Sequence, residues 1–226
     1  MNAFFLDRLN SEPHALAFAG QSTPWPVALA DQSTNPVLDG ELHAHAAAAQ
    51  ALLYPVAADL LATTGRPVDL FGFEANPARL GDAASAAASV PGIALTQLGA
   101  LIDAAELGYN PAKAKPIAVL GHSQGVLAVH MVQAIEQAGS IAAATAQIDE
   151  ILAIATLIGV AGPRQARQLG LAARHGEAPP MLSVKDITRA QVDALIARVS
   201  GVHGPIAVAV ANSATHYVLA GYPEDL

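Results

Sequence analysis

Short apolar runs alternate with longer helical patterns between residues 15 and 160. Ala15–Phe18 is an apolar run followed by Gly20, and residues 117–120 form a second run followed by Gly121. Runs of this length, bounded by turn residues, are typical of short buried strands. The longer patterns predict helices over residues 41–64 with a kink at Pro55, 96–107, 124–137, and 149–160 closed by Gly162 and Pro163. Alternating strands and helices predict an α/β fold, with a parallel sheet covered by helices.

Three stretches between these elements carry weaker patterns. Residues 21–40 contain Pro24, Pro26 and Pro36, and we expect an irregular loop there. Residues 68–73 look extended, and the Ala- and Ser-rich residues 76–90 fit either a helix or a loop. No internal repeat is found.

The pattern changes after about residue 180. Residues 181–184 predict a strand, 188–199 an amphipathic helix with Thr188 as its N-cap, and 206–211 and 216–220 two further strands. This β-α-β-β order opens a ferredoxin-like unit, whose second helix and last strand would be missing. We therefore expect an α/β core over residues 1–178 and an incomplete ferredoxin-like subdomain over residues 179–226.

Composition excludes several classes of function. The 226 residues carry a formal charge of −8 and no basic stripe, which argues against a nucleic-acid partner. The chain has no cysteine, so disulfides, Cys-based metal sites and a thiol nucleophile are excluded, and a cytoplasmic location fits. The N-terminus lacks the apolar region of a signal peptide, and no apolar stretch predicts a membrane span. No metal site is expected, because His43 and His45, two apart on a helix, point to different sides.

The chemistry of the chain centres on Gly121-His122-Ser123-Gln124-Gly125. This is G-x-S-x-G between a predicted strand and a predicted helix, the pattern of a nucleophile elbow. The tight turn needs residues without a Cβ on both sides of Ser123, and it pushes the hydroxyl out above the sheet edge. The Gln124 N–H, in the first turn of the helix, is placed to stabilise an oxyanion. The alternative is an ordinary Gly-rich turn with an exposed serine.

With these residues in view, the chain resembles the acyltransferases of fatty acid synthesis. It is most similar to the acetyltransferase domain at the start of bacterial and fungal type I fatty acid synthases, from about Ala15 to the end. Phe18-Ala19-Gly20-Gln21 resembles the family's FxGQ, which implies that the backbone N–H of Gln21 is a second oxyanion donor. The resemblance also implies an α/β-hydrolase-like core.

Three further residues gain a role from the resemblance. His122 would support the turn and line the site. Gln97, in Leu95-Thr96-Gln97-Leu98, would lie near the acyl pocket, and Asn212 belongs to a segment resembling the family's small subdomain.

The resemblance implies a ping-pong acyl transfer. Ser123 would attack the thioester of acetyl-CoA, and the acyl-serine would pass its acyl group to the phosphopantetheine thiol of an acyl carrier protein. No tightly bound cofactor is expected. The expected partners are acetyl-CoA, the carrier protein, other fatty acid synthase domains and further copies of the chain.

The nature of the acyl group follows from a missing cation. Malonyl-transferring relatives hold the malonyl carboxylate with an arginine, which suits a carboxylate in a buried site. No Lys or Arg lies between Lys115 and Arg164, and the apolar Ile158 stands at about the matching place. A neutral, short acyl group is therefore predicted. Two alternatives stay open: Ile158 is simply a core residue, or Arg164 or Arg167 reaches back into the pocket.

The general base is not evident in the sequence. In the resembled family the partner histidine follows the small subdomain, so we expect a fragment of a larger polypeptide, inactive by itself. Two rival functions remain. One is an α/β-hydrolase, an esterase or thioesterase, that uses Asp186 or Asp193 with His203 or His216. The other is a non-catalytic assembly segment of a megasynthase.

Overall fold

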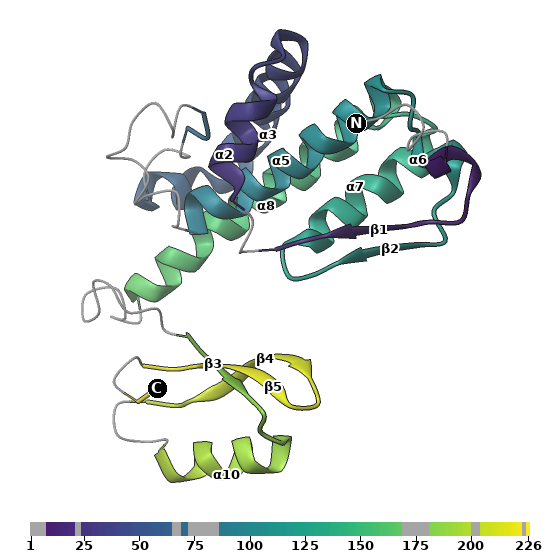
Figure 1. Cartoon of the computed structure of the whole chain (residues 1–226). Coiled ribbons are helices and arrows are strands. Elements are labelled where there is room, and N and C mark those ends of the chain that lie inside the picture. Colours follow the sequence, from purple (N-terminus) through teal and green to yellow (C-terminus); the bar gives the residue numbers. More distant parts are fainter. Residues whose placement is uncertain are drawn as a thin grey trace. The chain divides into compact units, whose positions relative to one another are not determined.

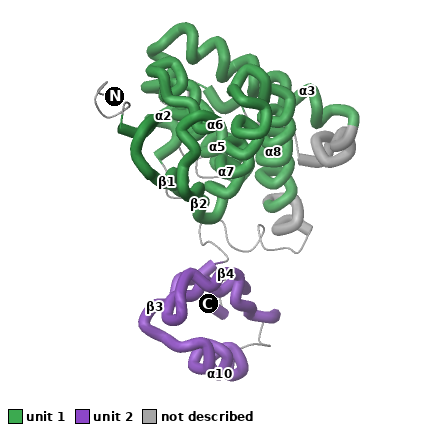
Figure 2. The backbone as a smooth tube through the Cα atoms, turned by 90° about the vertical axis from the view of Figure 1, so that its right-hand side faces the viewer, with its two compact units in different colours: residues 1–164 green, residues 165–226 purple. Residues whose placement is uncertain are grey.

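The computed structural model describes residues 8–20, 24–64, 69–71, 86–168, 181–199, 204–222 and 225–226. The chain divides into two compact units, residues 1–164 and 165–226, which are coloured separately in Figure 2. The predicted boundary between residues 178 and 179 lies outside the described residues. Each unit is considered by itself below.

The first unit contains a parallel pair of short strands. β1 (Ala15–Phe18) pairs with β2 (Ala118–Gly121), so that Ala15 lies opposite Ala118 and Phe18 opposite Gly121. α7 (Gly125–Ala138) follows β2 and runs along the pair in Figure 1. Both strands and this helix confirm the prediction. In the described part of the chain the parallel sheet has these two strands, and residues 69–71 form no strand. The α/β-hydrolase-like core thus stays a prediction.

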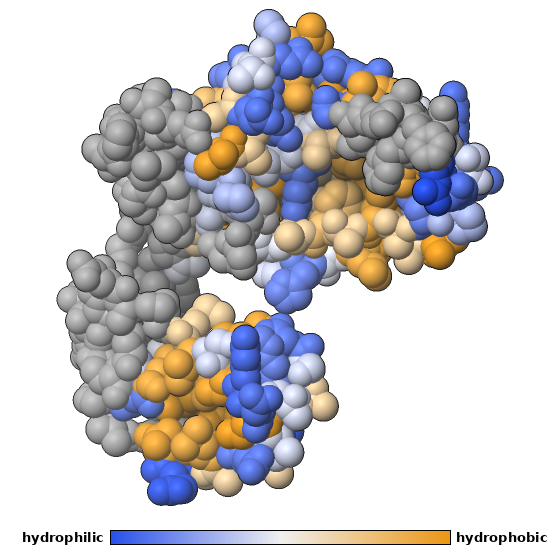
Figure 3. Space-filling view, in the orientation of Figure 1, coloured by the Kyte–Doolittle hydropathy of each residue, from blue (hydrophilic) through white to orange (hydrophobic). Residues whose placement is uncertain are grey.

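The burial predicted for the second apolar run was wrong. Ile117 is 74% exposed and Leu120 is 58% exposed. Val119 packs against the core, so its strand neighbour Leu120 points to the other side of the pair, and Ile117 lies just before β2 rather than in it. Figure 3 shows apolar side chains at the surface in this region of the first unit.

The irregular loop expected over residues 21–40 was also wrong. α2 (Trp25–Gln32) and α3 (Pro36–Thr64) are helices that begin within this stretch. Pro26 and Pro36 occupy the first turns of these helices, where a missing N–H breaks no helical hydrogen bond and the fixed φ is favourable. The Asn35 side chain accepts from the Val37 N–H at 3.1 Å, which caps the start of α3. The expected kink residue Pro55 lies inside α3.

Two other helices are longer than their sequence patterns predict. α5 (Ala86–Glu106) begins ten residues before the predicted start and continues through Pro91, and α8 (Thr145–Gln168) continues through Gly162 and Pro163. Close packing occurs next to Pro91 in α5 and at Gly159 in α8, whereas Gly162 has open space around it. A Cβ on Gly92 would lie 2.5 Å from the Trp25 ring, and one on Gly159 would lie 2.6 Å from the Ala86 carbonyl oxygen. Packing between helices thus outweighs the weak local preference.

α5 is the central helix of the first unit. Ile93, Leu95 and Leu98 are at most 1% exposed, and Met131 of α7 and Ile148 of α8 complete the same core. By length and composition, residues 86–106 and 142–162 are apolar enough to cross a membrane. Buried residues make up 78% of the apolar window of the first and 44% of that of the second, and both contribute to this core.

The second unit has the predicted β-α-β-β order. It comprises β3 (Met181–Lys185), α10 (Arg189–Val199), β4 (Ala207–Ser213) and β5 (His216–Ala220). β5 lies between β3 and β4 and is antiparallel to both, which is the arrangement of a split β-α-β unit. The predicted cap is confirmed, since the Thr188 hydroxyl accepts from the Gln191 N–H at 3.4 Å. Val192, Ile206, Tyr217 and Leu219 form a separate small core.

Candidate functional site

The turn between β2 and α7 has the geometry of a nucleophile elbow. β2 ends at Gly121 and α7 begins at Gly125, and the Gly125 N–H donates to the His122 carbonyl at 2.9 Å to close the turn. Ser123 lies in the left-handed region, with φ of 53°. For a residue with a Cβ this conformation costs about 1–2 kcal/mol, so the surrounding structure must hold it. The Ser123 side chain is exposed, as the motif predicts.

Close backbone packing explains the two flanking glycines. A Cβ on Gly121 would lie 2.5 Å from the carbonyl carbon and oxygen of Gly125. A Cβ on Gly125 would overlap the carbonyl oxygen of Phe18. Both glycines are therefore required because other backbone atoms occupy the place of a side chain, which agrees with the sequence-based expectation.

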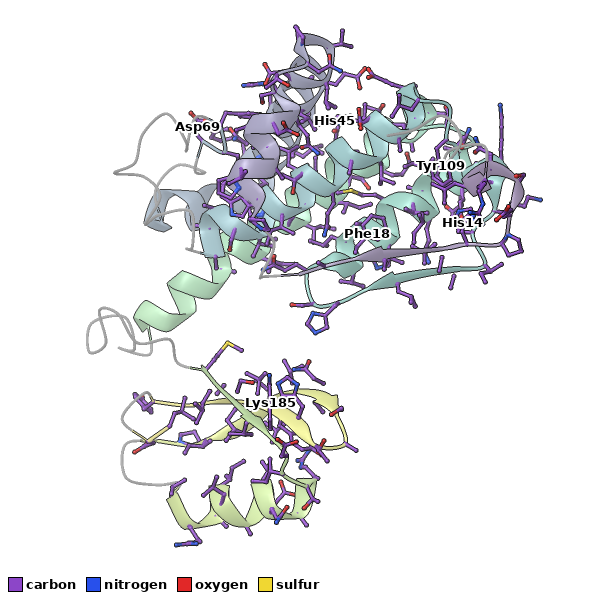
Figure 4. All side chains as sticks on the ribbon, in the orientation of Figure 1. His14, Phe18, His45, Asp69, Tyr109 and Lys185 are labelled. Carbon is purple, nitrogen blue, oxygen red and sulfur yellow. The ribbon has the colours of Figure 1, made fainter. Side chains whose placement is uncertain are left out.

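The end of β1 lies directly against the elbow. The His122 N–H donates to the Phe18 carbonyl at 3.0 Å, and Phe18 is labelled at this end of the strand in Figure 4. Gly20 is buried, and a Cβ there would lie 2.9 Å from the Ser123 Cβ and 3.4 Å from the Gln124 nitrogen. The two motifs, about a hundred positions apart, thus meet at one place. Gln21, the predicted second oxyanion donor, lies outside the described residues.

Gln97 fastens the central helix to this strand end. Its Nε2 donates to the Ala19 carbonyl at 2.6 Å, and its side chain is only 8% exposed. Its Oε1 is buried and has no hydrogen-bond partner among the described residues. The structure therefore places Gln97 beside the peptide that leads to Gly20, close to the elbow. Contact between Gln97 and a substrate stays a prediction.

Gln124 is the N-cap of α7, with φ of −61° and ψ of −22°. The first backbone N–H groups of a helix point toward its N-terminus, and the helix dipole adds partial positive charge there. Ser123, which directly precedes this N-cap, thus lies at the positive end of α7, as would the oxyanion of a tetrahedral intermediate formed at its hydroxyl. This arrangement suits a reaction in which negative charge develops on an oxygen beside Ser123.

The remaining predicted residues lie further along the chain. Ile158 is on α8 and is 51% exposed, so the alternative of a core residue was wrong, and its place in an acyl pocket stays a prediction. The side chains of Arg164 and Arg167 lie outside the described part. Asn212 lies on β4, in the second unit.

The described histidines other than His122 have partners that lie outside the elbow. His14 binds Tyr109, His43 binds the Asp39 carbonyl, His130 binds Gln133 and His216 binds Ser183. His45 binds Asp149 and is discussed below. His175 and His203 lie outside the described residues. Across that part, no group of three or more His, Cys, Asp and Glu side chains is placed to hold a metal ion.

The structure also brings together a buried polar pair that no sequence pattern indicates. His45 Nδ1 and Asp149 Oδ1 are 2.5 Å apart, and each residue is 8% exposed. The residues are 104 positions apart, on α3 and α8, so no local pattern links them. The sequence pattern sets His45 beside His43 and does not indicate Asp149 as the partner of His45.

Comparison with known proteins agrees with this geometry. The family model described as starter unit:ACP transacylase in aflatoxin biosynthesis matches residues 72–226, a range that contains the elbow and the whole second unit. No curated protein matches the chain. The β1 strand and Gly20 precede the matched range, yet they pack against the elbow. Since the match covers more than half of the sequence, the chain belongs to the starter unit:ACP transacylase family.

Proposed function

We propose that Ser123 is the acyl-carrying residue of this transacylase. The family acts on acyl carrier protein, so transfer of an acyl group to such a carrier is its activity. The observation that supports the role of Ser123 is its left-handed backbone in a glycine-flanked turn, with its side chain exposed. A strained, exposed hydroxyl at a helix N-terminus is what nucleophilic acyl transfer requires.

In the proposed reaction, the Ser123 oxygen attacks the thioester carbonyl of an acyl-CoA. The tetrahedral intermediate collapses as the carbon–sulfur bond breaks, the CoA thiol leaves, and the serine proton passes to a base and then to the leaving sulfur. The phosphopantetheine thiol of the carrier protein attacks the acyl-serine in the same way and regenerates the hydroxyl. The acyl group thereby moves without oxidation or reduction.

The oxyanion of each intermediate would be stabilised by two backbone N–H groups, those of Gln124 and Gln21. The Gln124 nitrogen is 3.4 Å from the place of a Cβ on Gly20, the residue before Gln21. The two donors therefore belong to segments that touch. Removal of one such donor typically raises the barrier by about 3–4 kcal/mol. His122 supports the turn through its bond to Phe18.

The acyl group we propose is acetyl, carried by acetyl-CoA. No Lys or Arg occurs between Lys115 and Arg164, and Ile158 is apolar at the place expected for an acid-binding cation. An unpaired carboxylate in such a pocket would be strongly disfavoured. Gln97 and Asn212 are proposed to line the bound substrate. We further propose a cytoplasmic multienzyme setting, as in fatty acid synthase priming, in which another segment supplies the base.

The hydrolase alternative is less well supported. Its acid and base candidates lie in the second unit, where Asp193 pairs with Arg189 at 2.8 Å and His216 contacts Ser183 at 2.9 Å. That unit is an antiparallel sheet with one helix in the described chain, rather than further parallel strands. The transacylase family match also favours transfer over hydrolysis.

Acyl loading measured by intact mass tests the proposal. A longer polypeptide that contains this chain together with the proposed base is incubated with acetyl-CoA or malonyl-CoA, followed by carrier protein that bears phosphopantetheine. Ser183→Ala is a matched control, because Ser183 is the exposed serine that contacts His216. We expect acetyl loading that Ser123→Ala abolishes, Ser183→Ala preserves, and carrier protein discharges. Loading that survives in Ser123→Ala would overturn the role of the elbow, and equal malonyl loading would overturn the choice of acyl group.

A further inference from the structure

A second concave site lies in the first unit, away from the elbow. It is a cavity of about 640 Å³ between α3, the C-terminal part of α5 and the start of α8. Its walls are apolar, formed by alanines together with Ile102 and Ile141. No residue that lines it belongs to the elbow or to the strand end beside it. Figure 4 likewise shows His45, which lines the cavity, well separated from Phe18.

The buried His45–Asp149 pair lines this cavity. Asp149 accepts a hydrogen bond at Oδ1, which fixes the ring proton of His45 on Nδ1. Nε2 of the neutral ring is then an acceptor. His45 has no other partner in the described part of the chain, and its Nε2 is not among the polar atoms shut away from solvent. In a residue that is 92% buried and lines a cavity, that nitrogen opens into the cavity.

Every other polar side chain around the cavity also presents acceptors. The Thr145 hydroxyl donates to the Ala142 carbonyl at 3.0 Å, so its oxygen is left to accept. Glu41 and Glu106 line the cavity as exposed carboxylates, which have no proton to donate when ionised. No Lys or Arg lines the site. With His45 neutral or charged, the lining therefore carries net negative charge.

We propose that this cavity binds a primary alkylammonium group. The ammonium head has three donors and a positive charge, which match the His45 nitrogen, the Asp149 carboxylate and the two glutamates. The alkyl part packs along the alanine and isoleucine walls. The volume lies in the range of small-molecule sites, which are apolar cavities with a few convergent polar groups. The site is separate from acyl transfer, because it shares no residue with the elbow.

A chemical-shift titration of the ¹⁵N-labelled protein tests the proposal, with n-butylammonium as the probe and butan-1-ol as its uncharged counterpart. Two sets of glutamate-to-glutamine variants test whether the charge of the cavity residues is needed for binding. Glu41→Gln combined with Glu106→Gln removes the exposed carboxylates of the cavity, and Glu150→Gln removes an exposed carboxylate of α8 that does not line it. Asp149→Asn tests the buried partner, with circular dichroism to check the fold.

We expect saturable shifts at the cavity residues with n-butylammonium, and binding of butan-1-ol weaker by about tenfold. The double glutamine variant should weaken the ammonium by a similar factor, whereas Glu150→Gln and Ser123→Ala should leave it unchanged. Equal binding of the alcohol, shifts spread over the surface, or the same loss in Glu150→Gln would overturn the site. Unchanged binding in a folded Asp149→Asn protein would also overturn the proposal, because the Asp149 carboxylate is one of the groups proposed to bind the ammonium.

Discussion

At the scale of single residues, Ser123 is one of three non-glycine residues with a left-handed backbone in the described part of the chain, together with Lys115 and Asp186. Its φ of 53° is one that glycine adopts freely and other residues avoid. The flanking glycines relieve crowding around the turn but not this strain, because the nucleophile itself needs a side chain. At this position the fold would be more stable with glycine, whereas the proposed reaction needs the serine hydroxyl.

Replacing Ser123 by glycine should release the strain. Ser123→Gly is expected to have a free energy of unfolding about 1 kcal/mol higher than Ser123→Ala, which keeps a Cβ in the left-handed region. Both variants lack the hydroxyl, so the comparison isolates the backbone. Urea denaturation of the two proteins gives the difference. Equal stability would contradict a turn that holds residue 123 in this conformation.

Tyr109 links the stability of the first unit to alkaline pH. It is 2% exposed, its hydroxyl is 2.8 Å from His14 Nε2, and burial together with the charge of Glu136 raises the pKa of Tyr109 to about 12. A raised pKa means that the folded state keeps its proton longer than the unfolded chain, whose tyrosine pKa is about 10. The contribution of protonated Tyr109 to the free energy of unfolding is thus complete below about pH 10 and is lost as the pH rises toward 12.

Tyr109→Phe should therefore flatten the alkaline loss of stability. The free energy of unfolding of the unmodified protein is expected to fall more steeply between about pH 10 and pH 12 than that of the variant. Denaturant titrations across this interval provide the measurement, and Tyr54→Phe, at an exposed tyrosine, serves as control. Parallel pH profiles for all three proteins would contradict the assignment.

At the scale of elements, the contact between α7 and β1 depends on one missing side chain. Gly125→Ala would force the Phe18 carbonyl away from the turn, and overpacking of this kind typically costs about 1–3 kcal/mol. Gly40, inside α3, has open space around it, so Gly40→Ala should instead gain up to about 1 kcal/mol. Thermal or urea unfolding of the two variants shows whether each raises or lowers the free energy of unfolding. A loss in both variants would indicate a general effect of alanine rather than the contact.

The elements that the sequence predicts well are those with a local cause. β1, β2, α7 and the β-α-β-β unit follow from apolar periodicity and from glycine or threonine at their ends. The starts of α2 and α3 do not, because a proline favours the first turn of a helix but disrupts its interior. The start of α5 does not either, because this helix continues through Pro91. Contacts such as Gln97 with Ala19, 78 positions apart, leave no local trace and depend on tertiary packing. The same holds for His45 with Asp149.

In the candidate site, too, the features with a local cause were predictable and those that depend on tertiary packing were not. The elbow and its two glycines were predictable, because a short motif with strict backbone demands carries its own geometry. The resemblance predicts the Gln21 N–H as an oxyanion donor, which stays a prediction, and the structure shows that Gly20, the residue before it, lies against Ser123. The base and the residues that line an acyl pocket stay predictions, because contacts between segments far apart in the chain leave no local sequence pattern.

At the scale of the whole molecule, the two units have separate cores, so we expect each unit to have its own free energy of unfolding. Among the described residues, the core of the second unit rests on four buried side chains, whereas the first unit buries most of α5 and the inner faces of α7 and α8. Small domains bury a smaller fraction of their surface and are correspondingly marginal. The second unit should therefore open more readily than the first.

Hydrogen exchange followed by mass spectrometry measures this difference. Amides of β3, β4 and β5 are expected to exchange before those of α5 and α7, and urea should produce two transitions rather than one. A single transition, with the same protection in both units, would show that they unfold together.

The left-handed turn also restricts which amino acid can serve as the nucleophile. Threonine has two heavy atoms on its Cβ and is strongly disfavoured at positive φ. Serine and cysteine have only one and fit this backbone better. Threonine, which shares the reactive group of serine, is thus the less tolerable exchange, and the chemically different cysteine is the better one. At this position the handedness of the α-carbon, more than the reactivity of the side chain, limits the substitutions open to mutation.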